Sequence, residues 1–113
     1  MELEILDILD CKDYEHERIV LQVTDNCNCW PFMLFKSQSG SNGTKSAFIF
    51  PNLEVQKGDM ITIYSKKGKD YKIRLSNGYK NHCLFWGEDN SVWTDSRNAA
   101  MLVKIEEYNY KVF

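Results

Sequence analysis

Apolar and polar residues alternate in short runs along much of this chain, and turn-forming residues separate the runs. The segment 18–24 shows the pattern most clearly, because Ile19, Leu21 and Val23 fall on one side of an extended backbone and their neighbours fall on the other. The segment 60–64 is the strongest strand prediction, since it is rich in β-branched and aromatic residues. No long stretch has a helical period. We therefore predict an all-β fold of roughly eight to ten short strands.

The remaining predicted strands are bounded by glycine, proline, asparagine and serine. They cover residues 3–8, 30–36, 47–50, 71–75, 84–86, 99–105 and 108–113. The segment 30–36 is apolar nearly throughout, which favours a strand covered on both faces. A glycine- and serine-rich connection follows it, and residues 76–78 (Ser-Asn-Gly) are typical of a hairpin turn.

The stretch 82–103 organises the rest of the chain. It places two apolar runs and two tryptophans between polar turns. A tryptophan can bury roughly 150–250 Å², so Trp86 is expected in the core, and Trp93 either in the core or as an exposed binding platform. The predicted core consists of Leu21, Phe50, Ile61, Ile63, Leu84, Trp86 and Leu102.

Length and composition fit one soluble globular domain spanning residues 1–113. The chain is 43% hydrophobic and carries a formal net charge of -2, so it can build a core without an unusual surface. No segment approaches the roughly 20 apolar residues that span a bilayer. The acidic N-terminus lacks the features of a signal peptide, so a complete chain of this sequence is expected in the cytoplasm.

Four cysteines are present, at positions 11, 27, 29 and 83, and we expect them to be reduced thiols. A zinc site formed by Cys27, Cys29, His82 and Cys83 is the alternative. Paired zinc-binding cysteines usually have two or more residues between them, and this chain has one. The sequence therefore predicts no metal or other cofactor.

The segment 66–80 is the most suggestive surface feature, because it holds six basic residues against one acid. Basic side chains contact phosphates and aromatic rings stack on bases. The candidate ligand-binding residues here are Lys66, Lys67, Lys69, Tyr71, Lys72, Arg74 and Tyr79. The competing interpretation is a solvated edge hairpin whose lysines prevent strand aggregation. The sequence pI of about 5.6 also argues against a general nucleic-acid binder.

No group of residues predicts catalysis. Glu88, Asp89 and Asp95 lie close to the tryptophans in sequence, but these residues are also ordinary turn formers. His82 and Cys83 are neighbours on a predicted strand, where adjacent side chains point to opposite faces. A nucleophile, a base and an orienting group do not converge in the sequence, so we do not expect an enzyme.

Several motifs occur in a characteristic order. They are the Trp30-containing strand, residues 48–51 (Phe-Ile-Phe-Pro), Leu53, residues 57–59 (Lys-Gly-Asp), the strand 60–64, residues 84–86 (Leu-Phe-Trp), residues 92–93 (Val-Trp) and the segment 95–102. This order resembles the lamin tail domain, an immunoglobulin-like β-sandwich found at the end of nuclear lamins and in many bacterial proteins. The resemblance covers roughly residues 3–112 and is closest to a bacterial-type member. Many family members carry Gly-Asp where Arg97 and Asn98 stand here, and the segment 66–81 looks like an elongated hairpin.

The resemblance implies an immunoglobulin-like β-sandwich without a shared catalytic residue set. We therefore expect a binding module whose partner is a protein, contacted through sheet edges and loops. Two alternatives remain open. One is an anionic polymer such as nucleic acid bound by the segment 66–80, and the other is a glycan bound on an exposed Trp93 with Asp89 and Asn90. The sequence does not determine the oligomeric state.

Overall fold

The computed structural model describes residues 1–38, 44–94 and 98–106, and within them it contains strands and no helix. The prediction of an all-β fold is confirmed. The strands are β1 (Leu3–Leu9), β2 (Arg18–Val23), β3 (Cys27–Asn28), β4 (Phe32–Gln38), β5 (Thr44–Ile49), β6 (Glu54–Val55), β7 (Met60–Tyr64), β8 (Tyr71–Arg74), β9 (Lys80–Phe85) and β10 (Asn98–Lys104).

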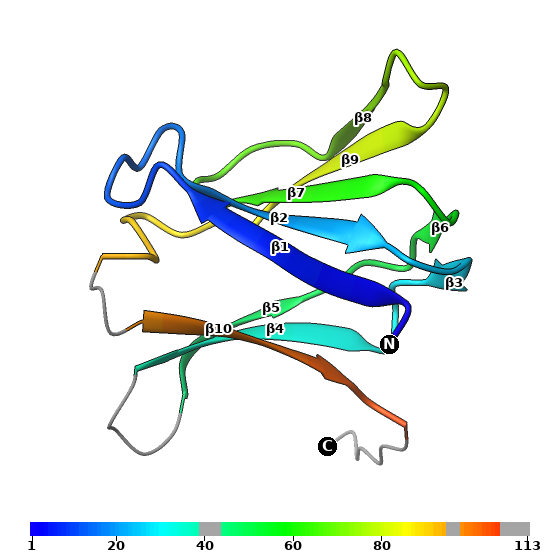
Figure 1. Cartoon of the computed structure of the whole chain (residues 1–113). Helices are drawn as coiled ribbons and strands as arrows, with labels where there is room; N and C mark the ends of the chain where they lie inside the picture. The colour runs from blue at the N-terminus through cyan, green and yellow to red at the C-terminus, as the bar shows by residue number, and fades with distance from the viewer. Residues whose placement is uncertain (39–43, 95–97, 107–113) are drawn as a thin grey trace, which may run out of the picture.

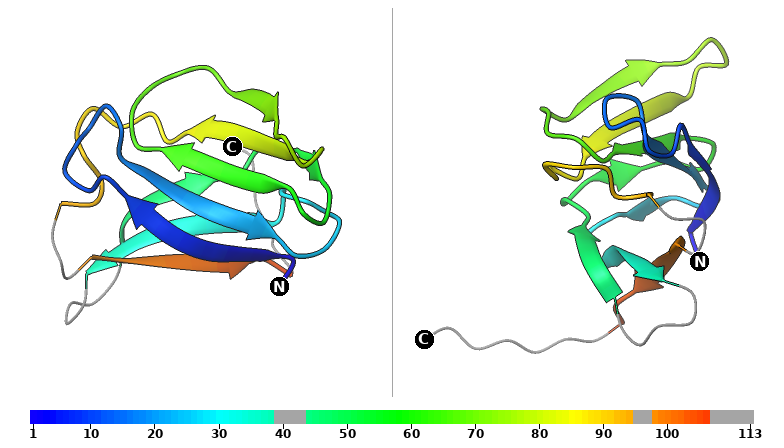
Figure 2. Two further views of the ribbon diagram at one scale, coloured as in Figure 1. Left: turned by 45° about the horizontal axis from the view of Figure 1, so that its top comes forward. Right: turned by 90° about the vertical axis from the view of Figure 1, so that its left-hand side faces the viewer.

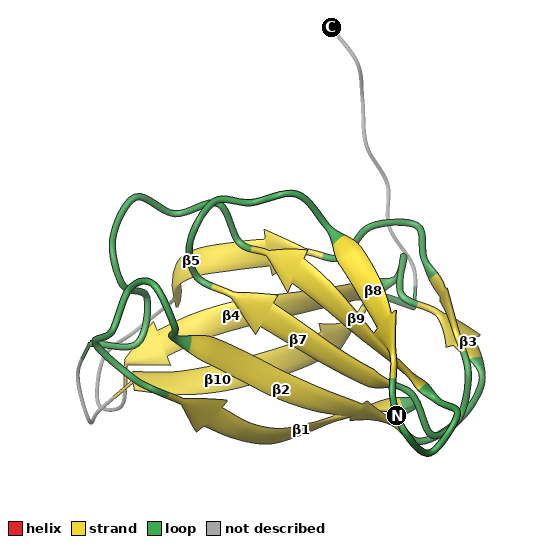
Figure 3. Ribbon diagram, turned by 90° about the horizontal axis from the view of Figure 1, so that it is seen from above, coloured by secondary structure: helices red, strands yellow, loops and turns green. Residues whose placement is uncertain are grey.

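The strands form two main sheets that face each other (Figures 1 and 3). One is five-stranded in the order β1-β2-β7-β9-β8, and the other is three-stranded in the order β10-β4-β5. A short ladder joins β3 to β6. Neighbouring strands are antiparallel except β7 and β9, which run parallel. The larger sheet has more strands than the smaller one, and its edge strand β8 lies farthest from the smaller sheet (Figure 2).

The core fills the space between the two sheets. Ile19, Leu21, Ile61 and Ile63 project from the larger sheet, and all four are almost completely buried. The smaller sheet and its flanks contribute Phe32, Leu34, Phe48 and Phe50. Burying each such side chain stabilises the fold by roughly 1.5–3 kcal/mol. Of the predicted core residues, Leu21, Phe50, Ile61, Ile63 and Leu84 are buried, whereas Trp86 and Leu102 are partly buried and pack against the core.

The two tryptophans of the stretch 82–103 contact each other at the edge of this core. Trp86 and Trp93 meet edge to face with centroids 5.9 Å apart, and Phe48 lies 5.7 Å from Trp86. Trp93 is only 2% exposed although its segment is not a strand. The segment that carries Trp93 therefore packs as a loop, whereas the second apolar run of this stretch lies on β10.

Some strand boundaries match the sequence prediction and others differ from it. β7 matches its predicted range, and β2 ends one residue early. β4 begins at Phe32 because residues 29–32 form a turn closed by the Phe32 N–H donating to the Cys29 carbonyl at 2.9 Å. β9 begins at Lys80, four residues before the predicted start, because its polar residues pair with β7 and β8. The predicted strand 108–113 lies outside the described residues.

A buried carboxylate holds one end of the fold together. Glu17 is 0% exposed, and it precedes β2. Its Oε1 accepts the backbone N–H of Lys12 at 3.0 Å. Its Oε2 accepts the Ser65 hydroxyl and, at 2.7 Å, the backbone N–H of Val92. One side chain therefore joins the β1–β2 turn, the segment after β7 and the loop that carries Trp93.

Replacing Glu17 by Gln should destabilise the protein by roughly 2–3 kcal/mol, because the amide nitrogen cannot accept a hydrogen bond and buried donors lose their partner. Urea unfolding followed by tryptophan fluorescence measures the difference. Glu15→Gln is the matched control, because the Glu15 side chain is 67% exposed and pairs with Lys66 at 3.5 Å. That variant should change stability by less than about 0.5 kcal/mol. Equal effects in the two variants would contradict this role of Glu17.

Candidate functional site

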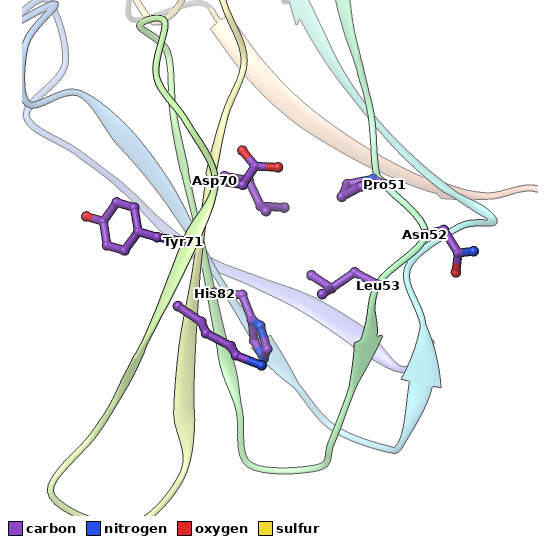
Figure 4. A pocket seen from close by; sticks show the side chains of 8 residues that line it. Pro51, Asn52, Leu53, Asp70, Tyr71 and His82 are labelled. Carbon is purple, nitrogen blue, oxygen red and sulfur yellow. The ribbon is translucent and has the colours of Figure 1, made fainter.

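A cleft of about 400 Å³ opens where β8 and β9 extend beyond the smaller sheet. The β8–β9 hairpin forms one side, and the segment 51–53 after β5 forms the other (Figure 4). Its apolar lining comes from Pro51, Leu53 and Leu84, and its ionisable lining comes from Asp70, Lys72 and His82. Leu53 points toward His82 across the cleft, whereas the ring of Tyr71 points away from it (Figure 4).

His82 is held in place by a buried carboxylate. Its Nε2 lies 3.0 Å from Oδ2 of Asp59, and both side chains are buried. Asp59 also accepts the backbone N–H groups of Gln56 and Lys80, each at 3.1 Å. Burial alone would raise the pKa of Asp59, but the hydrogen bonds from His82 and the two backbone groups outweigh it and hold that pKa below its usual value. Asp59 therefore stays ionised and orients the imidazole.

The strand register places four basic or ionisable side chains on one face of the hairpin. Lys72 lies directly opposite His82, and Arg74 lies directly opposite Lys80. Directly opposed residues on antiparallel strands project from the same face, with Cβ atoms about 4.5–5.5 Å apart. His82 is buried toward the core side of β9, so all four residues belong to that face. No described carboxylate is within ion-pair distance of Lys72, Arg74 or Lys80.

The other predicted basic residues lie elsewhere. Lys66 is 3.5 Å from Glu15, and its ammonium lies 5.6 Å from the centre of the Tyr64 ring. Lys67 pairs with Asp89 at 2.6 Å. Both precede β8, at the end opposite the hairpin turn, and Lys69 is exposed in the same connection. The structure therefore does not gather the basic residues of the segment 66–80 onto one surface.

The two candidate tyrosines each pack against another part of the molecule. Tyr71 is half exposed, and its ring lies 6.1 Å from Phe85 on the opposite face of the hairpin. Tyr79 packs over the backbone of Gly58, where an added Cβ would lie 2.4 Å from the tyrosine ring. Gly58 also has a φ of +98°, so both its backbone and its neighbour require glycine. β8 is an edge strand, and all four of its residues are exposed, as the edge-hairpin interpretation expects.

Of the two environments considered for Trp93, the structure shows the core, and the alternative of an exposed platform is wrong. Its ring is buried against Trp86, so it offers no platform for a sugar ring. The indole Nε1 has no hydrogen-bond partner among the described residues. The tryptophan that is exposed is Trp30, whose exposed fraction is 54%. The sequence predicted that Trp30 lies within a strand. Trp30 instead occupies the turn before β4.

The outer face of the smaller sheet is strongly apolar. Because Phe32 and Leu34 face the core, Met33 and Phe35 between and beyond them face outward. The outward residues on the neighbouring strands are Ile49 on β5 and Met101 and Val103 on β10. Ile49 is 64% exposed and Met101 is 44% exposed. Apolar residues on both faces of the segment 30–36 were the sequence signal for this surface, although the sequence suggested that both faces are covered.

A groove of about 280 Å³ lies at one end of this apolar face. Trp30, Pro31, Met33, Ile49 and Ile105 line it, and Glu106 lies at its margin. We call this surface, with Phe35, Met101 and Val103, the Trp30 face.

The cysteines do not form the alternative zinc site in the described residues. Cys27 lies on β3 and Cys29 directly after it, whereas Cys83 lies on β9. His82 faces Asp59, and Cys83 projects from the opposite face of the same strand. No cluster of three or more potential metal ligands occurs in the described part of the chain. Burial raises the pKa of the Cys29 thiol to about 12, so this thiol stays protonated.

No family model matches this chain, and no curated protein or solved structure is significantly similar to it. The described residues contain no helix long and apolar enough to cross a membrane. Interpretation of the cleft and of the Trp30 face therefore depends on their chemistry.

Asp59→Asn should destabilise the protein at pH 6 by roughly 1.5–3 kcal/mol, because a charged acceptor of three hydrogen bonds is lost. The lowered pKa of Asp59 contributes stability at pH values above its unfolded pKa of about 4, and this contribution is lost as pH falls through the lower pKa of the folded state. The difference between wild type and variant should therefore shrink between pH 6 and pH 3 in urea unfolding. The exposed Asp70→Asn should show no such change, and a difference independent of pH for Asp59→Asn would contradict the assignment.

Proposed function

We propose that this protein is a non-catalytic module that binds a protein partner through the Trp30 face. The observation that carries the proposal is the exposure of Ile49 and Met101 on the outer face of the smaller sheet, with the exposed Trp30 in the groove at one end of that face. Contiguous exposed apolar surface is uncommon on monomeric proteins and usually marks an interaction site. Tryptophan and methionine are also enriched at protein interfaces.

The groove beside Trp30 indicates the chemistry of the partner. An apolar lining of this size suits the insertion of an apolar or aromatic side chain, which is how most interfaces concentrate their binding energy. Glu106 lies at the margin of the groove with its side chain 80% exposed, and its only described cationic neighbour is Lys104 at 3.8 Å. We therefore propose a partner segment with an apolar anchor next to a lysine or arginine.

We also propose that the fold is immunoglobulin-like, of the lamin tail domain type. The order of motifs in the sequence supports this assignment. Two facing sheets, with Phe48, Trp86 and Trp93 in contact at the edge of the core, are compatible with it. In such modules function depends on surface sites, so the Trp30 face and not the fold is the basis for the proposed activity.

The placement of the ionisable residues supports the proposal that the module is non-catalytic. His82 and Asp59 resemble the base and orienting group of a hydrolase, but the third member would be a nucleophile beside His82. Cys83 is the nearest candidate in sequence and projects from the other face of β9. The two carboxylates Glu88 and Asp89 are adjacent in a loop, and Asp89 is paired with Lys67.

The alternatives have weaker support. Nucleic-acid binding by the segment 66–80 requires its basic and aromatic residues to act on one surface. Lys66 and Lys67 lie before β8 and pair with Glu15 and Asp89, and the Tyr71 ring lies on the other face of the hairpin from Lys72 and Arg74. Glycan binding at position 93 loses its aromatic platform because that ring is buried.

Substitution of the Trp30 face should abolish partner binding while leaving the fold intact. A partner isolated from the source cells with the wild-type protein would be produced in recombinant form, and its affinity would be measured by calorimetry. Trp30→Ala with Ile49→Ser should weaken binding at least about tenfold, since interface hot spots are worth 2 kcal/mol or more. Both residues are exposed, so the melting temperature should change little.

The matched control is Lys67→Gln with Lys69→Gln, on the connection before β8. This control should bind the partner with wild-type affinity. Loss of binding in the control and not in the Trp30-face variant would contradict the proposal. A wild-type dimer in light scattering that the Trp30-face variant converts to a monomer would also contradict it, because the face would then be a self-association surface.

A further inference from the structure

The basic face of the β8–β9 hairpin carries an unbalanced positive charge. Arg74 and Lys80 are directly opposite each other, and Lys72 lies two residues along the strand on the same face. Like charges in directly opposed positions repel, so this arrangement is unfavourable without an anion. Ion pairs elsewhere in the described residues, such as Lys104 with Glu2 at 2.9 Å, show that other lysines have carboxylate partners.

The arrangement suits one compact anion. Rows two residues apart on a strand are separated by about 6.6 Å, so Lys72, Arg74 and Lys80 can converge on a single group between them. Arginine binds phosphate oxygens in a bidentate manner, and lysine adds a mobile positive charge. A phosphomonoester carries close to two negative charges at neutral pH and therefore complements three cations better than a carboxylate does.

The cleft begins where the basic residues end. Lys72 and His82 belong both to the basic face and to the cleft lining, so the two are continuous. The cleft volume of about 400 Å³ falls within the range typical of small-molecule sites. Leu53 and Leu84 offer apolar contact, and the Asp70 carboxylate can accept hydrogen bonds from hydroxyl groups. Asp59 fixes the His82 ring, so this part of the site is already organised.

We propose that this cleft binds a small organic phosphate whose body carries hydroxyl groups. The phosphate contacts Lys72, Arg74 and Lys80, and the body lies between His82 and Leu53 with its hydroxyl groups directed to Asp70. The site is formed by the β8–β9 hairpin and the segment 51–53, whereas the Trp30 face is the outer surface of the smaller sheet. The inference therefore goes beyond the proposed protein partner and does not depend on it.

The observations favour a small molecule over a nucleic-acid strand. A strand-binding groove combines a continuous basic track with stacking rings, but Tyr71 points away from the cleft and Lys67 is neutralised by Asp89. The basic face ends at a cleft with apolar walls, which suits a compact ligand body.

Titrations of the whole protein with inorganic phosphate and with ribose 5-phosphate test the proposal, followed by amide chemical shifts in two-dimensional NMR. Inorganic phosphate should shift amides of residues 72–74 and 80–82. Ribose 5-phosphate should bind at least tenfold more tightly and should also shift residues 53, 70 and 84. Lys72→Gln with Arg74→Gln should weaken both ligands at least tenfold, whereas Lys66→Gln with Lys67→Gln should leave both affinities within twofold of wild type.

Asp70→Ala separates the two parts of the site. This substitution should weaken ribose 5-phosphate several-fold and leave inorganic phosphate binding unchanged. The proposal is overturned if phosphate does not shift the hairpin amides, or if ribose 5-phosphate binds no more tightly than phosphate. A twelve-residue oligothymidine that binds more tightly than ribose 5-phosphate and is lost in the same double variant would also overturn it, in favour of a strand-binding surface.

Discussion

The fold depends on a carboxylate that is completely buried. Removing Glu17 from water is costly unless its oxygens accept hydrogen bonds, and the three donors that it finds come from three separate segments. These bonds hold Lys12 in a left-handed backbone conformation, at a φ of +74°, that a lysine seldom adopts. They also fix the backbone of Val92, and this positions the ring of the neighbouring Trp93 against Trp86.

Asp59 has a comparable role at the opposite end of the larger sheet. Glu17 lies where β2 begins and β7 ends, whereas Asp59 lies where β7 begins. Both acids satisfy backbone N–H groups that the sheet ladders leave open, which explains why acidic residues are tolerated in buried positions. Asp59 differs in also binding an imidazole, so the same contact that secures the end of the sheet shapes the wall of the cleft.

The sequence was most informative where one strand face is apolar and the other polar. β2 and β7 were predicted closely for this reason, and their inward residues form the core. It was least informative about which apolar side chains remain exposed, because that depends on the relative size of the two sheets. A third sheet or a partner would be needed to cover Ile49, and local pattern contains no information about either. Trp30 is exposed for the same reason, although the sequence placed it in a strand expected to be covered on both faces.

Part of the candidate cleft could be predicted from sequence. In the predicted strand 71–75, alternate residues share one face, so Lys72 and Arg74 fall together, and the register agrees with this. Their cross-strand neighbours could not be found, because polar Lys80 and His82 gave no strand signal in 80–83. The pairing of His82 with a carboxylate 23 residues earlier in the chain is a tertiary contact that no spacing rule predicts.

The parallel pairing of β7 and β9 has a consequence for how the protein folds. β8 and β9 are joined by a tight turn closed by the Gly78 N–H donating to the Leu75 carbonyl, so this hairpin can form within microseconds as a local unit. β9 can join β7 only after the whole connection that contains β8 has closed, which makes this a slower, non-local step. We therefore expect the hairpin to dock as a preformed unit late in folding. Its signature would be a low folding φ-value at Leu84, meaning that a substitution there changes stability but hardly changes the folding rate. The basic face would then exist before the cleft, whose opposite wall is supplied only when folding is complete.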